Sequence, residues 1–237
     1  MENNVYLKDK IEKLLLILND GLVGKEKIIK LGILSLMAGE NLILIGPPGT
    51  AKSEISRRFN KIFEKESYFE YLLTKFTTPE EIFGPFSIKK LQEDKFERST
   101  EGYIPRSKIV FLDEIFKANS SILNTLLTII NEKVFHNGIK IEKIPLISLI
   151  GASNEVPLDN EELTALYDRF LVRGIVDYIS DEEIEMLLDI ENNEIEIPEE
   201  LKFTLDELEE IRKNSKEIKV SNGIKKTIIE IRREYNK

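Results

Sequence analysis

The octapeptide Gly46-Pro47-Pro48-Gly49-Thr50-Ala51-Lys52-Ser53 constrains the fold of this 237-residue chain more than any other segment. It follows a short apolar run, residues 41–45, that predicts a buried strand, and it precedes a helix expected from residue 52 to about residue 64. A strand, a glycine-containing turn and a helix in this order predict a phosphate-binding loop. The alternative is a Gly-Pro turn before a helix whose first residue is lysine, which explains neither the strand nor the Lys-Ser pair.

Each position of this loop has a physical role. Gly46 and Gly49 let the main chain curl so that its N–H groups point toward phosphate oxygens. Lys52 would reach the β- and γ-phosphates, and Ser53 can ligate Mg²⁺. Ala51 stands where the pattern usually has its last glycine, which costs little if the φ of Ala51 is negative. The remaining residues expected to contact the nucleotide are Pro47, Pro48 and Thr50.

Two carboxylates follow a second apolar run. Residues 109–112 predict a central strand, and Asp113 and Glu114 stand at its end. Asp113 would hold Mg²⁺, directly or through water, and Glu114 would activate the attacking water. Acidic residues also follow strands as helix N-caps, which is the alternative for this pair taken alone. Downstream of a phosphate-binding loop, the pair favours hydrolysis over transfer to a second substrate.

Two further positions are candidates for the same chemistry. Asn154 follows an apolar strand and could orient the nucleophilic water or contact the γ-phosphate, although asparagine is also a common turn residue. Arg169 could be supplied to a neighbouring subunit to neutralise charge on the γ-phosphate, and Arg173 is the second choice. The alternative for Arg169 is an ordinary surface arginine that pairs with Asp168.

Strands and helices alternate through the first 180 residues. Two helices are expected before residue 40, and the later strands and helices predict a mainly parallel sheet covered on both faces. Two insertions interrupt this pattern, a hairpin or irregular excursion over residues 86–100 and a hairpin over residues 134–143 with a type I′ turn at Asn137-Gly138. The expected later strands are residues 68–73, 108–112, 146–151 and 171–177, and the expected helices are residues 119–130 and 161–170.

Composition changes after residue 180. Between residues 181 and 210 there are 14 acidic residues and one basic residue, and the apolar spacing indicates helices only. We therefore expect an α/β domain over residues 1–180, with the N-terminal helices in residues 1–40, and a small all-helical domain over residues 181–237.

Charge and composition exclude several classes of protein. The net charge is −9, from 34 basic and 43 acidic residues, which argues against a general nucleic-acid coat. There is no cysteine, so a disulfide framework, a thiolate zinc site and a cysteine nucleophile are impossible. Residues 1–20 lack the pattern of a signal peptide, and no apolar run approaches the ~20 residues that cross a bilayer. We expect a cytoplasmic protein without a membrane span.

These motifs, in this order, resemble the AAA+ family of ring-forming ATPases. The phosphate-binding loop, with alanine before Lys52, resembles the loop of the MoxR branch of this family. Several further segments resemble the RavA subgroup of that branch. The resemblance is dense over residues 20–178 and implies a three-layer αβα domain, a parallel sheet of order 5-1-4-3-2 and a small helical lid, here incomplete. The segments that carry the RavA resemblance are residues 74–85, 101–105, 112–115, 122–127, 131–132 and 165–170.

The resemblance also implies roles for individual residues, with ATP and Mg²⁺ as cofactors. Asp113 and Glu114 match the Walker B pair, and Lys52 and Ser53 match the residues that bind phosphate and Mg²⁺. Asn154 matches the sensor-1 position. Arg169 matches the arginine finger, and Val23-Gly24 matches the segment that lines the adenine pocket. The insertions at residues 86–100 and 134–143 match the helix-2 insert and the pre-sensor-1 hairpin, which usually face the ring pore and its substrate. The alternative is that both are additions at the edge of the fold without a role in substrate binding.

The lid departs from the family pattern. Relatives carry a serine–aspartate–arginine–arginine motif, whereas this chain has Val220-Ser221-Asn222-Gly223-Ile224-Lys225-Lys226. Lys225 or Lys226 could replace the arginine of that motif as a point charge, but not as a bidentate donor.

Outside the motifs, His136 is expected to be a solvated strand-end residue, and Arg57 and Arg58 are expected to be exposed on a helix.

The resemblance implies an Mg²⁺-dependent ATPase that forms a hexameric ring and remodels a partner protein with a von Willebrand factor A domain. One alternative is a nucleotide-dependent assembly switch with little turnover, which the altered lid motif favours. A second is a nucleic-acid motor, for which the insertions supply the basic residues Lys89, Lys90, Lys95, Arg98 and Lys140.

Overall fold

The computed structural model describes residues 2–63, 67–157, 161–189 and 194–235. The chain divides into two compact units, residues 1–202 and residues 203–237. The domain boundary expected at residue 180 falls inside the first unit and stays a prediction. None of the helices in the described ranges is long and apolar enough to cross a membrane.

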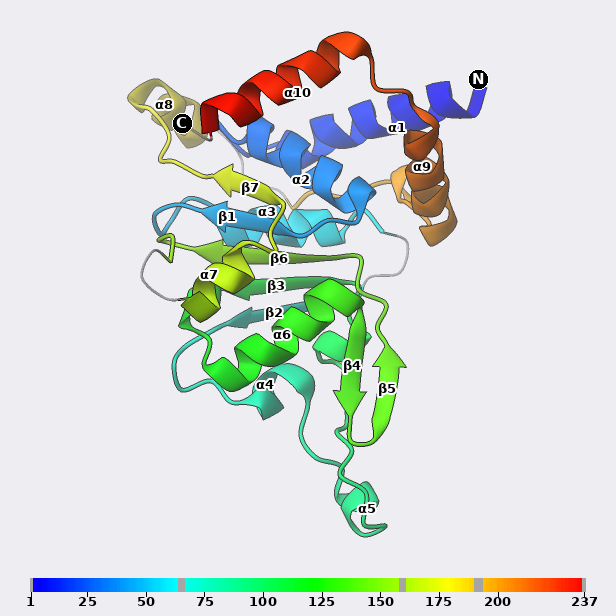
Figure 1. Cartoon of the computed structure of the whole chain (residues 1–237). Coiled ribbons are helices and arrows are strands. Elements are labelled where there is room, and N and C mark those ends of the chain that lie inside the picture. The colour runs from blue at the N-terminus through cyan, green and yellow to red at the C-terminus, as the bar shows by residue number, and fades with distance from the viewer. Residues whose placement is uncertain (1, 64–66, 158–160, 190–193, 236–237) are drawn as a thin grey trace. The chain divides into compact units, whose positions relative to one another are not determined.

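A five-stranded parallel sheet forms the centre of the first unit (Figure 1). Its spatial order is β2-β3-β6-β1-β7, so the strands of the predicted 5-1-4-3-2 sheet occupy their expected places. The α/β fold is therefore confirmed. The bounds are β1 Leu42–Ile45, β2 Tyr68–Leu72, β3 Ile109–Asp113, β6 Ser148–Ser153 and β7 Val172–Ile175.

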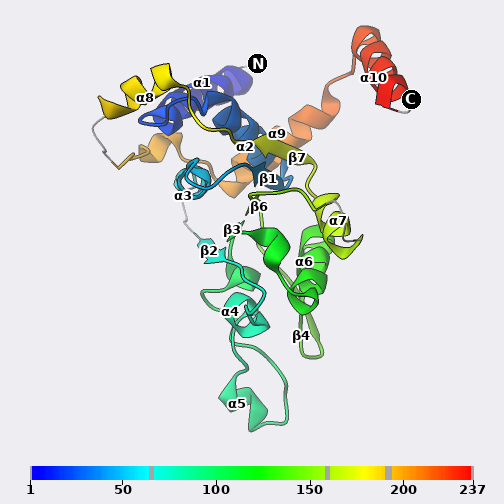
Figure 2. The same cartoon turned by 90° about the vertical axis from the view of Figure 1, so that its left-hand side faces the viewer.

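Helices cover both faces of this sheet (Figure 2). On one face lie α6 (Ser120–Glu132) and α7 (Glu161–Tyr167), whose apolar side chains share a buried cluster with Ile43 and Val110. On the other face, α2 (Glu26–Ala38) packs against α3 (Lys52–Asn60), and Gly32 of α2 lies directly against the ring of Phe59. Helix α1 (Glu2–Asn19) packs on α2. The two predicted N-terminal helices are confirmed, and α3 ends at Asn60, earlier than its expected end near residue 64.

The first insertion extends away from the sheet. Helix α4 (Pro79–Phe83) precedes it, and the insertion itself contains α5 (Ile88–Leu91). An isolated antiparallel bridge between Phe86 and Arg98 closes its base. The second is the predicted hairpin, formed by β4 (Val134–Asn137) and β5 (Lys140–Lys143) beside α6 (Figure 1).

The predicted turn of this hairpin is wrong by one residue. Asn137 pairs with Lys140, so the two loop residues are Gly138 and Ile139. Gly138 has a φ of +65°, whereas Ile139 has no positive φ. A type I′ turn needs a positive φ at both loop positions, which a β-branched isoleucine resists, so this turn is not of that type.

The described C-terminal residues form helices, as expected. In the first unit, α8 (Asp181–Leu188) begins with a capping box in which Ser180 and Glu183 satisfy each other's main-chain N–H groups. The second unit holds α9 (Leu205–Glu217), with the same motif at Thr204 and Glu207, and α10 (Asn222–Tyr235). The described residues also form the short 3-10 turns η1 Ile104–Arg106, η2 Ile115–Lys117 and η3 Glu199–Leu201.

Candidate nucleotide site

The predicted site residues meet at the carboxyl edge of three neighbouring strands. Strands β1, β6 and β3 lie side by side and parallel, and they end at the loop after Ile45, at Ser153 and at Asp113. Because ligands of open α/β sheets bind beyond the carboxyl ends of the strands, this edge is the expected position of a ligand. The topology therefore brings together the loop, the carboxylate pair and Asn154.

The first glycine of the loop cannot be replaced without moving the sheet. The N–H of Gly46 donates to the carbonyl of Ser153 at 3.0 Å. A Cβ atom at Gly46 would lie 2.0 Å from the carbonyl oxygen of Val176. Gly49 has a φ of +79° and nothing within 4 Å of its Cβ position, so its main chain is open to a ligand.

The condition under which alanine would cost little at position 51, a negative φ, is not met. Its φ is +67° and its ψ is 21°, which is the left-handed region, and it is the residue immediately before α3. The loop must reverse there to enter the helix, and the main-chain hydrogen bond from Ile55 to Ala51 fixes the first turn. Alanine therefore occupies a conformation that favours glycine, and its methyl group carries strain.

Lys52 is buried beneath the loop. Its Nζ donates to the carbonyl oxygens of Gly46 and Pro47, both at 2.8 Å, and lies 3.3 Å from Oδ1 of Asn154. Burial lowers the pKa of Lys52, and the negative charges of Asp113 and Glu114 oppose that shift. The ammonium group is held by two neutral oxygens that a phosphate could replace.

Glu114 is fixed by several groups at once. Its main chain has a φ of +52°, a rare conformation for a residue with a side chain. Its N–H donates to Oδ1 of Asp113 at 2.9 Å, and its carboxylate accepts a hydrogen bond from Nδ2 of Asn154 at 2.5 Å. Lys117, one turn later, forms an ion pair with it at 3.4 Å. The sequence prediction did not include Lys117, which the short spacing to Glu114 could have suggested.

Two cavities lie on either side of the loop. The larger, about 530 Å³, is lined by Lys52, Ser53, both Walker-type carboxylates and Asn154. The smaller, about 120 Å³, is mainly apolar, and both are lined by Gly49, Thr50 and Ala51. The larger, polar cavity suits the triphosphate of a nucleotide, and the smaller, apolar cavity suits its base. No group of three or more His, Asp or Glu side chains that could hold a metal ion is found among the described residues.

Val23 lines the smaller cavity, as expected. Gly24 does not; it has a φ of +68°, and a Cβ atom there would lie 2.5 Å from the Glu183 carboxylate. The sequence prediction missed the opposite wall, which is formed by Tyr178 and by Leu187 of α8. The local sequence does not identify these two residues as site residues, because the end of β7 and helix α8 come together only when the chain folds.

The two candidate arginines differ in what they contact. Arg169 is exposed after α7, and its guanidinium makes no hydrogen bond or ion pair with any described residue. Arg173 lies over the ring of Tyr167, 3.9 Å from its centroid, and donates to the carbonyl of Phe170. Asp168 pairs with Arg173 and not with Arg169. Of the two, only Arg169 has no side-chain partner among the described residues.

The two arginines of α3 are not alike. Arg57 is exposed and forms a bidentate pair with Glu70. Arg58 was expected to be exposed and is buried: it donates to the main-chain oxygens of Leu18 and Asp20 at the end of α1. It therefore ties the helix that follows the loop to the N-terminal helix. His136 is exposed on β4, as expected.

The sheet order, the loop after β1, the carboxylates after β3 and the amide after β6 define an AAA+ type α/β domain. Residues 9–213 match the family model described as the MoxR domain of MoxR–vWA–β-propeller ternary systems. The chain therefore belongs to the MoxR family.

The relatives extend beyond this chain. Two uncharacterized proteins of Methanocaldococcus jannaschii are 45% and 46% identical over 91% and 94% of the chain, which covers 56% and 58% of their lengths. A structural protein of Acidianus two-tailed virus is 33% identical over 87% of the chain and 35% of its own length. A crystal structure of a proposed ATPase from Cytophaga hutchinsonii has a TM-score of 0.75 at 20% identity over 97% of this chain and 69% of that one, which shows the fold alone.

Proposed function

We propose that this chain is the motor domain of an Mg²⁺-dependent ATPase that acts in a ring and remodels a partner protein. The observation that carries the proposal is the continuous set of contacts from Lys52 through Asn154 to Glu114 at the edge of the sheet. Membership in the MoxR family supports nucleotide binding. Because the chain spans little more than half the length of its archaeal relatives, the activity of the whole protein is part of the proposal.

Each site residue has one task in this mechanism. The main-chain N–H groups around Gly49 and the ammonium group of Lys52 bind the phosphates, and Ser53 and Asp113 would hold Mg²⁺. When bound, Mg²⁺ neutralises charge on the phosphate oxygens. Glu114 accepts a proton from the attacking water, and Asn154 orients the Glu114 carboxylate through the 2.5 Å hydrogen bond.

A ring supplies what one subunit lacks. Arg169 is exposed and unengaged among the described residues, so it is free to enter the site of a neighbouring copy and neutralise the γ-phosphate. The proposed ring is a hexamer of the RavA type. The proposed partner carries a von Willebrand factor A domain, which the description of the family model supports together with a β-propeller protein.

The test is phosphate release by the Glu114→Gln variant. The amide keeps the shape of the side chain but cannot accept the proton, so turnover should fall about 10²–10⁴-fold while ATP still binds. Glu132→Gln, at the exposed end of α6, is the matched control and should hydrolyse ATP normally. Unchanged turnover in Glu114→Gln would contradict the assignment, and so would equal release in wild-type protein with EDTA in place of Mg²⁺.

The alternative as an assembly switch rests on the lid. Lys225 and Lys226 are exposed on α10, at the positions where the family resemblance leads us to expect arginines. Sedimentation with and without ATP, alongside the phosphate-release assay, separates the two functions, because the switch assembles without releasing phosphate. The nucleic-acid alternative is weakened by local pairing: Lys90 and Lys95 contact Glu93, Arg98 contacts Glu80, and Lys140 contacts Glu97.

A further inference from the structure

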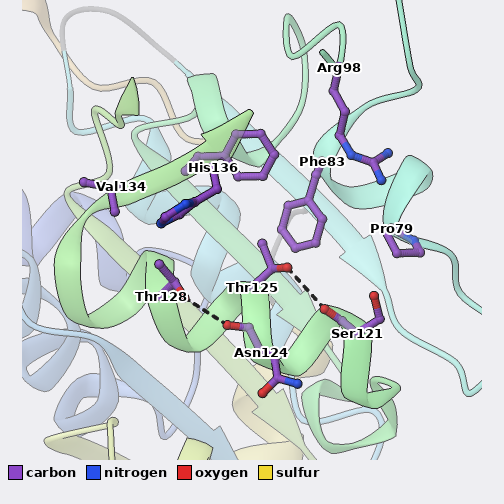
Figure 3. Close-up of a pocket in the computed structure, with 10 residues that line it drawn as sticks. Pro79, Phe83, Arg98, Ser121, Asn124, Thr125, Thr128, Val134 and His136 are labelled. Carbon is purple, nitrogen blue, oxygen red and sulfur yellow. Dashed lines mark hydrogen bonds between the residues drawn. The ribbon is translucent and has the colours of Figure 1, made fainter. Parts of the chain in front are cut away.

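A third cavity, of about 480 Å³, lies between α6, α4 and β4 (Figure 3). It shares no lining residue with either cavity of the nucleotide site. One wall is the polar side of α6, including Asn124, Thr125 and Thr128, and the opposite wall is formed by three consecutive residues, Val134, Phe135 and His136. Side chains alternate between the faces of a strand, so contact with three consecutive residues places the cavity along the edge of β4.

The hydrogen-bond pattern of the hairpin shows which groups this edge offers. The N–H of Ile144 donates to the carbonyl of Lys133 at 3.0 Å, so these two residues form a hydrogen-bonded pair. Such pairs alternate along an antiparallel ladder, which makes Val134 and His136 the residues whose N–H and C=O groups point away from β5. No described main-chain group outside the hairpin bonds to either residue. The outer edge of β4 is therefore open, and it faces the cavity.

The hairpin is held rigidly in this position. The buried Asn137 side chain accepts a hydrogen bond from the main-chain N–H of Arg98 at 2.6 Å and donates to the carbonyl of the same residue at 3.3 Å. Lys140 pairs with Glu97 at 2.9 Å. The main chain of Phe96 lies so close to Gly138 that a Cβ atom there would be 2.7 Å from its carbonyl oxygen. A strand edge fixed in this way requires little ordering when it binds another strand.

The walls of the cavity indicate the chemistry of an occupant. The floor contains the rings of Phe83 and Phe135, which suit an apolar side chain. The hydroxyl groups of Thr125 and Thr128 donate to main-chain oxygens of their own helix, whereas the exposed Asn124 amide makes no hydrogen bond with a described residue. The described lining residues include one guanidinium and one imidazole, from Arg98 and His136, and no carboxylate. Nη1 of Arg98 already binds the Glu80 carboxylate and the carbonyl of Gly84, so Nε and Nη2 are the guanidinium donors that bond to no described residue.

We propose that the open edge of β4 binds an extended segment of a partner polypeptide, which adds to the hairpin as a third strand and places a carboxylate side chain toward Arg98 and His136. Main-chain hydrogen bonds to Val134 and His136 supply affinity, and the cavity selects the side chains. The proposal extends the proposed function, since it names where a remodelled partner is held. Its test requires no ATP hydrolysis, so the two can fail separately.

The experiment measures amide hydrogen exchange in the 237-residue chain with a defined probe. The probe is a set of blocked heptapeptides in which threonine and valine alternate around one central residue, either glutamate or lysine. The glutamate peptide should slow exchange at Val134 and His136 and leave Ile141, on the opposite edge of the hairpin, unchanged. The lysine peptide should bind more weakly.

Two variants and one control identify the edge. His136→Pro removes an outward N–H without removing a bond of the hairpin and should weaken peptide binding about tenfold. Ile141→Pro makes the same change on the opposite edge and should bind normally. Asn124→Tyr fills the cavity without altering the strand and should also weaken binding. Peptide protection that survives in both His136→Pro and Asn124→Tyr, or absence of protection with every peptide, overturns the proposal. Protection of Val134 and His136 by ATP alone, in step with self-association, also overturns it, because a second copy would then cover the edge.

Discussion

Replacing Ala51 with glycine tests the strain in the phosphate-binding loop. At a φ of +67°, an L-residue costs about 1–2 kcal/mol relative to the right-handed region. Glycine removes that cost but makes the unfolded chain more flexible, which offsets about 0.4–1 kcal/mol. Because Ala51 is only partly buried, the loss of its methyl group removes little apolar contact. Ala51→Gly should therefore stabilise the protein by about 0.5–1 kcal/mol.

The matched control is Ala165→Gly in α7. Ala165 is exposed inside a helix, where glycine destabilises by about 0.5–1 kcal/mol. Both variants gain the same flexibility when unfolded, so the difference between them, about 1–2 kcal/mol, isolates the strain of the folded loop. For a chain of this size each kcal/mol moves the thermal midpoint by about 2–4 °C, which circular dichroism resolves.

The result that refutes this reasoning is a loss of stability in Ala51→Gly equal to that in Ala165→Gly. The left-handed conformation of Ala51 would then carry no measurable strain. The comparison should be made without nucleotide, since ligand binding adds stability of its own and would hide a difference of this size.

Two further substitutions probe the packing behind the site. Gly32→Ala would place a Cβ atom 2.0 Å from Cζ of the buried Phe59 ring, so we expect a loss of about 1–3 kcal/mol in urea unfolding despite the better helix propensity of alanine. Arg58→Met should lose about 2–4 kcal/mol in the same assay, because the buried main-chain oxygens of Leu18 and Asp20 lose their donor. An Arg58→Met variant as stable as the wild type would show that water replaces the guanidinium.

The order of strands and the location of the site could be predicted because they depend on patterns within short segments. The apolar run before Gly46 and the carboxylates after residue 112 each mark the end of a buried strand, and parallel strands bring their ends to one edge. The spatial order of the strands was predicted from the family resemblance. These predictions do not depend on the exact residues at which each strand or helix begins and ends.

The wrong predictions concern properties that depend on distant parts of the chain. The φ of Ala51 follows from the angle between β1 and α3, which the eight loop residues do not specify. Arg58 is buried because α1 ends against it, and no local pattern carries that contact. The hairpin turn falls at Gly138-Ile139 because Asn137 is used elsewhere, as the side chain that binds the main chain of Arg98.

Helix α6 connects the two regions on which both proposals depend. It begins six residues after Glu114 and continues through Lys133 into β4, which Asn137 joins to the first insertion. At 1.5 Å per residue its 13 residues span about 20 Å, so a tilt of about 10° at the carboxylate end displaces the hairpin end by about 3.5 Å. The helix can thus act as a lever that couples the carboxylate end to the hairpin. Because Asn137 binds the hairpin to the first insertion, a tilt of α6 would move the hairpin and the insertion in the same direction.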